Sequence, residues 1–182
     1  MTFLGGQLLI ASPHLSDRNF FRSVVLILSH NEEHAFGLLL NRPIHEPLSK
    51  VWTELTDEDC ANQVQIRSGG PLQGPLMVIH QNRKVADTQI APSVQLSSTR
   101  NSIRQLLEKN DRPLLPIVGY SGWGPGQLES EMEIGGWMTV PGTKEIVFAD
   151  PDEQWNIASR QVSDSILAGV EIRHVPNDPR WN

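Results

Sequence analysis

The sequence predicts an α+β protein, in which strands linked by short turns are interspersed with helices. Short apolar runs rich in branched side chains recur along the chain, bounded by Gly, Pro or Asn, which is typical of strands. In other segments the apolar residues recur every three or four positions, which predicts helices. Strands and helices do not alternate regularly, so the pattern favours the α+β class over a parallel α/β fold.

Three strands are expected near the N-terminus. Residues 7–11 form a short apolar run, and residues 23–28 and 36–40 are almost continuously apolar. Runs of that kind are typical of strands that are buried on both faces. The short polar break at residues 31–35 predicts a hairpin between the second and third strands.

Further elements are expected along the rest of the chain. Leu48, Trp52 and Leu55 share one face at helical spacing, and Asp150 with Pro151 supplies an acceptor and a proline at a helix start. Helices are predicted at 48–55, at 98–109 with Ser97 or Ser98 as cap, and at 127–132, 150–162 and 164–168; strands are predicted at 64–67, 76–80, 114–119, 137–140 and 145–148. No linker or internal repeat is found, so residues 1–182 are expected to form a single domain.

The composition narrows the classes of function. The net charge is −6 and clustered Lys and Arg, which phosphate backbones require, are not seen, so no specific nucleic-acid partner is expected. Cys60 is the single cysteine, so no intrachain disulfide can form. The N-terminus has no basic signal-peptide region, and no apolar run approaches the roughly 20 residues that span a bilayer. A cytoplasmic protein without a membrane partner is expected.

The most informative segment is residues 119–131, in which four glycines and a proline surround Tyr120 and Trp123. Glycine permits backbone angles that other residues avoid, and it lets another group approach closely. A strand-to-helix turn of this composition is a common place for a ligand or a packed partner. We expect at least one of these glycines to have a positive φ or a tight contact, the Trp123 ring to be buried, and Gln127 and Glu131 to share a helix face.

Three motifs of catalytic or ligand-binding sites are either incomplete or in the wrong structural context. His30–His34 matches the H-x-x-E-H zinc pattern, but that pattern requires a helix, and here the residues join two predicted strands, so a polar hairpin turn is favoured. Ser121 stands where a nucleophile elbow would place it, but the pattern requires glycine at the position of Trp123. A dinucleotide loop would require glycine at the position of Gln127. No catalytic residue, metal ligand or cofactor is assigned.

Polar and glycine residues stand near the ends of the predicted strands. They can be caps and turn formers, or they can line a shared cleft, and both interpretations remain open. The residues predicted for the binding cleft are Ser12, His14, Arg22, Asn41, Arg42, Gly69, Gly70, Tyr120, Trp123, Gln127 and Glu131.

Many of the same residues carry a family resemblance. Segments 6–13, 22–25, 30–33 and 37–43, then Gly69-Gly70-Pro71, 119–131, Trp137 and Asp150-Pro151 resemble, in this order, the pattern of the AlgH/YqgE family. The resemblance covers roughly residues 5 to 160. It implies a cytosolic protein with a compact α+β fold, whose twisted mixed or antiparallel sheet closes into a pseudo-barrel flanked by helices. It supplies no catalytic residue and no cofactor. His34 stands where the family commonly has glycine, and the segment after Ile166 differs from the better-known bacterial members.

Three classes of function follow. A regulatory or ligand-binding protein that takes an unknown small ligand or a protein partner comes first, because the predicted cleft carries no complete catalytic set. A hydrolase or another enzyme with an unrecognised site comes second. A DNA-associated transcriptional regulator comes third, because the chain is acidic and Arg100 and Arg104, which share one helix face, are more often part of a solvated surface. The oligomeric state stays open.

Overall fold

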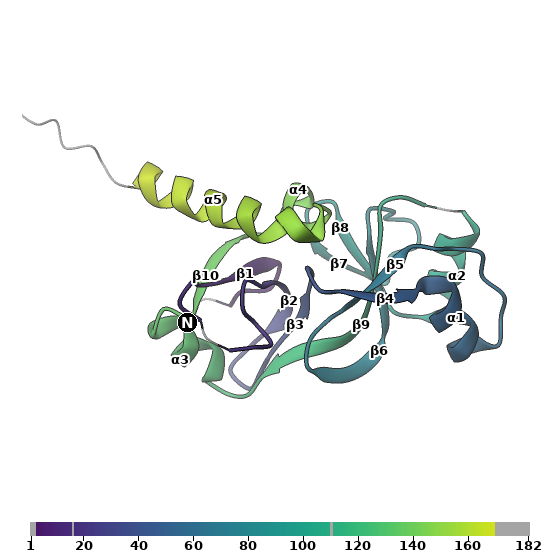
Figure 1. Cartoon of the computed structure of the whole chain (residues 1–182), viewed down its shortest axis with the longest axis horizontal. Coiled ribbons are helices and arrows are strands. Elements are labelled where there is room, and N and C mark those ends of the chain that lie inside the picture. The colour runs from purple at the N-terminus through teal and green to yellow at the C-terminus, as the bar shows by residue number, and fades with distance from the viewer. Residues whose placement is uncertain (1–2, 16, 110, 170–182) are drawn as a thin grey trace, which may run out of the picture.

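The computed structural model describes residues 3–15, 17–109 and 111–169, and these residues form ten strands and five helices (Figure 1). The strands are β1 (Gln7–Ala11), β2 (Val24–His30), β3 (Ala35–Leu39), β4 (Pro43–Pro47), β5 (Gln65–Ser68), β6 (Leu72–His80), β7 (Thr88–Ala91), β8 (Val94–Ser97), β9 (Leu114–Trp123) and β10 (Trp137–Pro141). The helices are α1 (Leu48–Thr56), α2 (Arg100–Glu108), α3 (Gln127–Glu133), α4 (Lys144–Val147) and α5 (Pro151–Gly169).

The long strand β9 joins the two halves of the sheet. Its first part pairs with β6 and β5, and its end pairs with β3. The strand order is β10-β1-β2-β3-β9-β6-β8-β7, with β4 attached through β5, and only the β5–β9 ladder among the described strands is parallel. The predicted α+β class with a twisted, mixed and mainly antiparallel sheet is confirmed. The sheet curls into a half-barrel, and closure into a pseudo-barrel is not confirmed.

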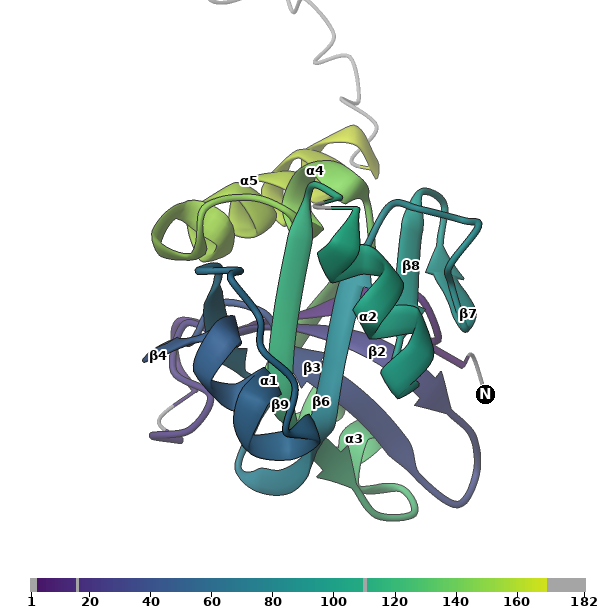
Figure 2. The ribbon, with the colours of Figure 1, turned by 90° about the vertical axis from the view of Figure 1, so that its right-hand side faces the viewer.

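Helices cover the sheet on several sides, and this explains the continuous apolar runs. Leu8 and Ile10 of β1 face one core cluster, which α4 and α5 cover, whereas Leu9 and Ala11 face a second cluster beside α3. Successive side chains of a strand point to opposite faces, so a strand covered on both sides needs apolar residues at every position. A third cluster lies beneath α1 and α2, which Figure 2 shows side by side over β6 and β9.

Several predicted elements differ from the structure. Residues 145–148, predicted as a strand, belong to the one-turn helix α4, in which the backbone N–H of Val147 donates to the carbonyl of Thr143 at 2.9 Å. Ile146 and Val147 are both buried, and so short an apolar run does not distinguish a strand from a helical turn. The helices predicted at 150–162 and 164–168 form one continuous helix, α5. The cap of α2 is Thr99, whose side chain accepts from the Ser102 N–H, and not Ser97 or Ser98.

Three strands escaped prediction because their residues carry weak strand signals. β4 begins and ends with proline, which is tolerated because β4 pairs only with β5 at an edge. β7 and β8 have four residues each and include the polar Gln89 and Gln95. The predicted hairpin between β2 and β3 is confirmed, with the Asn31 N–H donating to the carbonyl of His34 at 2.9 Å. Among the described residues, no helix has the length and apolar character needed to span a membrane.

Candidate functional site

The glycine-rich segment is mostly strand, and a tightly packed corner follows it. β9 continues to Trp123, so that only residues 124–126 remain as the turn before α3. The Trp123 ring is buried and lies 6.0 Å from the Trp137 ring, centroid to centroid. Both indole N–H groups donate to Oε2 of Glu131, at 3.0 and 2.8 Å, and Gln127 donates to Oε1 of the same carboxylate at 2.9 Å. The buried ring and the shared face of Gln127 and Glu131 are as expected.

The glycines before this corner allow two backbone segments to touch. Gly119 has a φ of +80°, and a Cβ on Gly69 would lie only 2.2 Å from the Gly119 carbonyl oxygen. The tight approach predicted for this segment is therefore present. Tyr120 packs on Phe36 in the cluster beneath α5, whereas Trp123 packs in the cluster beside α3. The two aromatic rings consequently serve different cores.

In two of the three motifs considered above, the key side chain is hydrogen-bonded within the fold. The Ser121 hydroxyl is buried and donates to the Gly69 carbonyl at 3.1 Å, so its proton is held by the fold. The His30 ring is buried; Nδ1 accepts from the Leu4 N–H at 3.2 Å, and Nε2 lies 2.9 Å from Glu129. His34 is exposed. Within the described residues, no three His, Cys, Asp or Glu side chains are grouped to hold a metal ion.

A second group of cleft residues meets where β1, β2 and β3 adjoin α5. Asn41 accepts from the Val24 N–H at 3.0 Å and donates to the Arg22 carbonyl at 2.8 Å. Arg42 donates to the carbonyls of Phe21 and Asn41. Ser12 directly follows Ala11, and the Ala11 carbonyl accepts a hydrogen bond from the Trp155 indole at 2.9 Å. Arg22, Asn41 and Arg42 are thus linked directly.

Nine of the eleven predicted cleft residues fall into three neighbourhoods, which are Arg22, Asn41 and Arg42 at the strand ends; Gly69, Gly70 and Tyr120 along β9; and Trp123, Gln127 and Glu131 at the corner. Ser12 and His14 follow β1, where the His14 N–H donates to the Ser12 hydroxyl at 3.3 Å and the Ser12 N–H donates to the Gly136 carbonyl at 2.9 Å. None of the eleven residues lines any of three hollows that the described residues form. A cleft shared by all eleven therefore stays a prediction.

The largest of those hollows lies between α2 and the segment that follows α1, and we call it the interhelix hollow. Its volume is about 670 Å³, within the range of roughly 300–1,000 Å³ that is usual for small-molecule sites. Trp52, Cys60 and Leu107 contribute its less polar lining. Its charged lining residues are Glu58, Asp59, Arg104, Glu108 and Arg112.

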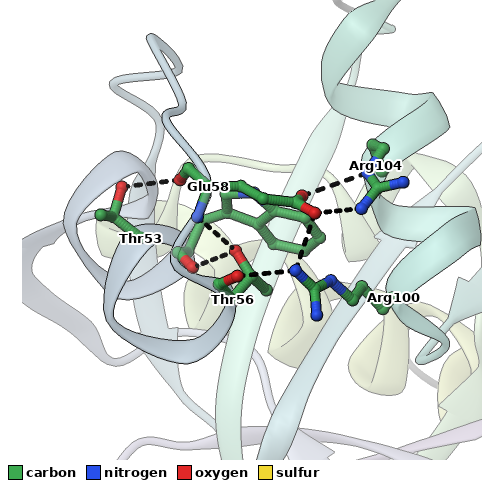
Figure 3. Close-up of polar contacts among 6 residues, drawn as sticks. Thr53, Thr56, Glu58, Arg100 and Arg104 are labelled. Atoms are coloured by element: carbon green, nitrogen blue, oxygen red, sulfur yellow. Dashed lines mark hydrogen bonds and ion pairs between the residues drawn. The ribbon is translucent and has the colours of Figure 1, made fainter.

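One carboxylate ties the two walls of the interhelix hollow together. Figure 3 shows Glu58 bound by both Arg100 and Arg104 of α2, with Oε1 lying 2.7 Å from Nη2 of Arg100 and Oε2 lying 3.1 Å from Nε of Arg104. Arg100 also donates to the Thr56 carbonyl at 2.6 Å, and the Thr53 hydroxyl donates to the Glu58 carbonyl at 2.9 Å. The hydrogen bond from Arg104, followed by that from Arg100, lowers the pKa of Glu58, and Glu58 in turn raises the pKa of Arg104.

Little in the sequence indicated that the interhelix hollow would form. Arg100 and Arg104 share a helix face, and acidic residues precede Cys60, so a contact between opposite charges could have been suspected. The two segments are more than 40 residues apart, however, and no motif joins them. Arg67, Gln154 and Trp155, which adjoin the Arg22 neighbourhood, were also missed, because each stands in an ordinary strand or helix pattern.

The chain is similar to proteins from several bacteria. It is 36% identical over 183 residues to a UPF0301 protein of Rhizobium meliloti (strain 1021), with 91% of this chain and 90% of that protein covered. It is 35% identical over 169 residues to a UPF0301 protein of Xanthomonas oryzae pv. oryzae, with 88% and 90% covered.

Solved structures show the same fold. The solution structure of the AlgH protein from Pseudomonas aeruginosa matches with a TM-score of 0.75 at 28% identity, covering 93% of this chain and 95% of that one. A crystal structure of a Corynebacterium diphtheriae protein matches in fold, with a TM-score of 0.72 at 24% identity and 87% and 86% coverage. The AlgH-like family model matches residues 8–166. The chain therefore belongs to the AlgH-like family.

Proposed function

We propose that the chain is a ligand-binding protein of regulatory type, and that the interhelix hollow takes a small molecule. The observation that carries the proposal is a hollow of about 670 Å³ that has both an apolar lining and a charged rim. Ligand sites commonly combine an apolar wall, which supplies affinity, with a few polar groups that orient the ligand. Trp52 and Leu107 suit the first role, and Arg112 and Glu108 suit the second.

The Glu58 contacts make this hollow suited to a regulatory response. The segment after α1 has no regular secondary structure from Asp57 to Val64, and the ion pairs to α2 hold it in place. A ligand that competes for Arg104 would release this segment, and one that bridges the walls would fasten it. Either effect would couple occupancy to the shape of this surface.

Among the described residues, no arrangement of side chains favours the enzyme or the DNA-associated alternative. The Ser121 hydroxyl proton is held by a backbone carbonyl, which does not suit an attacking nucleophile. Arg100 and Arg104 both pair with Glu58, so much of their charge is balanced within the chain rather than offered to a phosphate backbone.

The single cysteine provides a direct test, because Cys60 lines the interhelix hollow. A library of small thiol fragments is offered as mixed disulfides in the presence of reductant, and the fraction of protein captured is read by mass spectrometry. We expect a few fragments to be captured about tenfold more strongly than the median, which corresponds to roughly 1.4 kcal/mol of non-covalent binding.

Two tryptophan variants make the test specific. Leu107→Trp should fill the hollow and remove the preference among fragments. Leu167→Trp makes the same change at an exposed position of α5 and should leave the preference intact. Equal capture of all fragments by the unmodified chain, as expected of a thiol on open surface, would overturn the proposal.

A further inference from the structure

Three arginines lie around the short segment that follows β3, in the neighbourhood already described for Arg22 and Asn41, and two of them, Arg22 and Arg67, also contact the start of α5. Arg67 of β5 donates from Nη1 to the Leu40 carbonyl at 2.6 Å and lies 3.4 Å from the side-chain oxygen of Gln154. Arg42 donates to the neighbouring Asn41 carbonyl at 3.1 Å. Asn41 also holds the backbone of Arg22, so all three arginines are tied to the same short segment after β3.

None of these three arginines has a carboxylate within ion-pair distance among the described residues, whereas Arg100 and Arg104 do. Arg67 is half-buried, and burial lowers its pKa to about 10, although the charge of Asp150 acts in the opposite direction. Burial also lowers the pKa of Arg42. Charges withdrawn from water are normally balanced by a partner of opposite sign. In the described part of this chain, Asp150 supplies an opposite charge that acts on Arg67, but no carboxylate there forms an ion pair with Arg67 or Arg42.

The guanidinium groups retain donors for such a partner. Arg22 has a φ of +50°, and its guanidinium carbon lies 5.2 Å from the centre of the Trp155 ring and 5.5 Å from that of Phe21. Stacking on aromatic rings orients a guanidinium while leaving its N–H edges free. Within the described residues, neither the Arg22 guanidinium nor Nε and Nη2 of Arg67 has a hydrogen-bond acceptor.

We propose that the cluster of Arg22, Arg42 and Arg67 binds the terminal phosphoryl group of a small phosphorylated molecule. Planar guanidinium groups offer paired N–H donors that match the oxygens of a phosphoryl group. Arg22 and Arg67 donate to the ligand, while Arg42 adds positive charge and uses its own hydrogens to hold the loop at Phe21. The site shares no lining residue with the interhelix hollow, so either proposal can fail without the other.

A substitution at Asp150 should change the affinity for a phosphoryl group in the direction opposite to the loss of an arginine. The Asp150 side chain accepts from the Asp152 N–H at 2.9 Å at the start of α5, and its negative charge acts on Arg67 and raises the pKa of that guanidinium. Asn at position 150 would still accept this hydrogen bond but would carry no charge. Asp150→Asn should therefore tighten the binding of a phosphoryl group, while loss of an arginine should weaken it.

The experiment is calorimetric titration of the full chain with pyrophosphate and, separately, with glycerol 3-phosphate, at constant ionic strength. We expect saturable binding of at least one of them, and the tighter one distinguishes an inorganic from an organic phosphate source. Arg22→Asn and Arg67→Lys should each weaken binding about tenfold or more, because each removes a charge-assisted or paired contact. Arg83→Asn, the matched change at an exposed arginine between β6 and β7, should leave it unchanged.

Three results would overturn the inference. One is no saturable binding of either phosphate at millimolar concentration. Another is equal binding of citrate with the same response to the variants, which would assign the cluster to carboxylates. The third is weakening by Arg83→Asn as large as that by Arg22→Asn, which would indicate non-specific attraction. Arg22 is exposed and Asn tolerates a positive φ, so Arg22→Asn is expected to fold. Arg22→Asn therefore keeps the test decisive if Arg67→Lys fails to fold.

Discussion

The corner around Trp123 and the interhelix hollow are built in opposite ways. In the corner, the Glu131 carboxylate receives three donors and the indole rings are buried, so polar and apolar groups are satisfied within the chain. Around the hollow, partly exposed ion pairs from Glu58 hold two segments beside open space. The most distinctive stretch of sequence thus supplies packing, while the hollow is assembled from residues without a motif.

The largest effect on stability is expected in the corner. Trp123→Ala should lower the free energy of unfolding by roughly 3–5 kcal/mol, because it opens a cavity in a packed core and leaves Glu131 with one donor fewer. Urea denaturation measures the change. A loss below about 1 kcal/mol, comparable with a surface substitution, would contradict the packing described for this ring.

The next largest loss of stability is expected at a glycine in tight contact with backbone, and a smaller loss at a glycine that faces open space. Gly69→Ala should cost roughly 1–3 kcal/mol or more, because the new Cβ meets the Gly119 carbonyl oxygen. Gly126→Ala meets no atom within 4 Å and has only its φ of +67° to strain, so it should cost about 1–2 kcal/mol. Chemical denaturation of the two variants gives the order, and a larger loss for Gly126→Ala would reverse the interpretation.

Acid should weaken the core beside α2 through His80. Its ring is buried, with Nε2 lying 2.9 Å from the Ser97 hydroxyl and Nδ1 accepting from the Asn82 N–H at 3.1 Å. Burial lowers the pKa of His80, with Asp111 and Asp87 acting in the opposite direction. The folded state therefore prefers the neutral ring, so its contribution is complete above the unfolded pKa of about 6.5 and is lost as pH falls below it.

The pH effect is measured as the difference in unfolding free energy between the unmodified chain and His80→Gln, from pH 7.5 to pH 5. That difference should shrink as the pH falls. His45→Gln, at an exposed histidine, serves as the control and should show a difference that changes little. A difference that grows on acidification would mean that the folded chain favours the charged ring.

The smallest loss of stability is expected when the ion pairs of Glu58 are removed. Glu58→Gln removes the charge that Arg100 and Arg104 share, but all three side chains are partly exposed, so water and salt screen their attraction. The variant should lose slightly less stability at 1 M sodium chloride than at low salt. A loss as large as that of Trp123→Ala, or one independent of salt, would remove the contrast between the two regions.

The sequence predicted best the elements whose pattern is long or continuous. The runs that became β2 and β3 were identified with their hairpin, because strands covered on both faces need apolar residues throughout. The face of α1 was evident from Leu48 and Trp52, both buried. By contrast, α4 is one turn long, and its buried Ile146 and Val147 fit a strand equally well.

The candidate sites depended on contacts that no local pattern encodes. The sequence singled out Arg22, Asn41 and Arg42, which do meet, but Arg67 joins them only through the pairing of β5 with β4 and β9. Glu58 reaches α2 across a gap of more than 40 residues. Glycines that allow close backbone approach mark packing and binding alike, so the segment around Gly119 did not reveal which it served.

The contrast between the two regions can be tested with two variants in one assay. Fragment capture at Cys60 and the free energy of unfolding are measured for Trp123→Phe and Leu107→Trp. We expect Trp123→Phe, which loses the indole donor to Glu131, to lower stability and keep the same preferred fragments. Leu107→Trp should lose that preference with a smaller change in stability. Loss of capture in both variants in proportion to lost stability would contradict a separate binding role for the interhelix hollow.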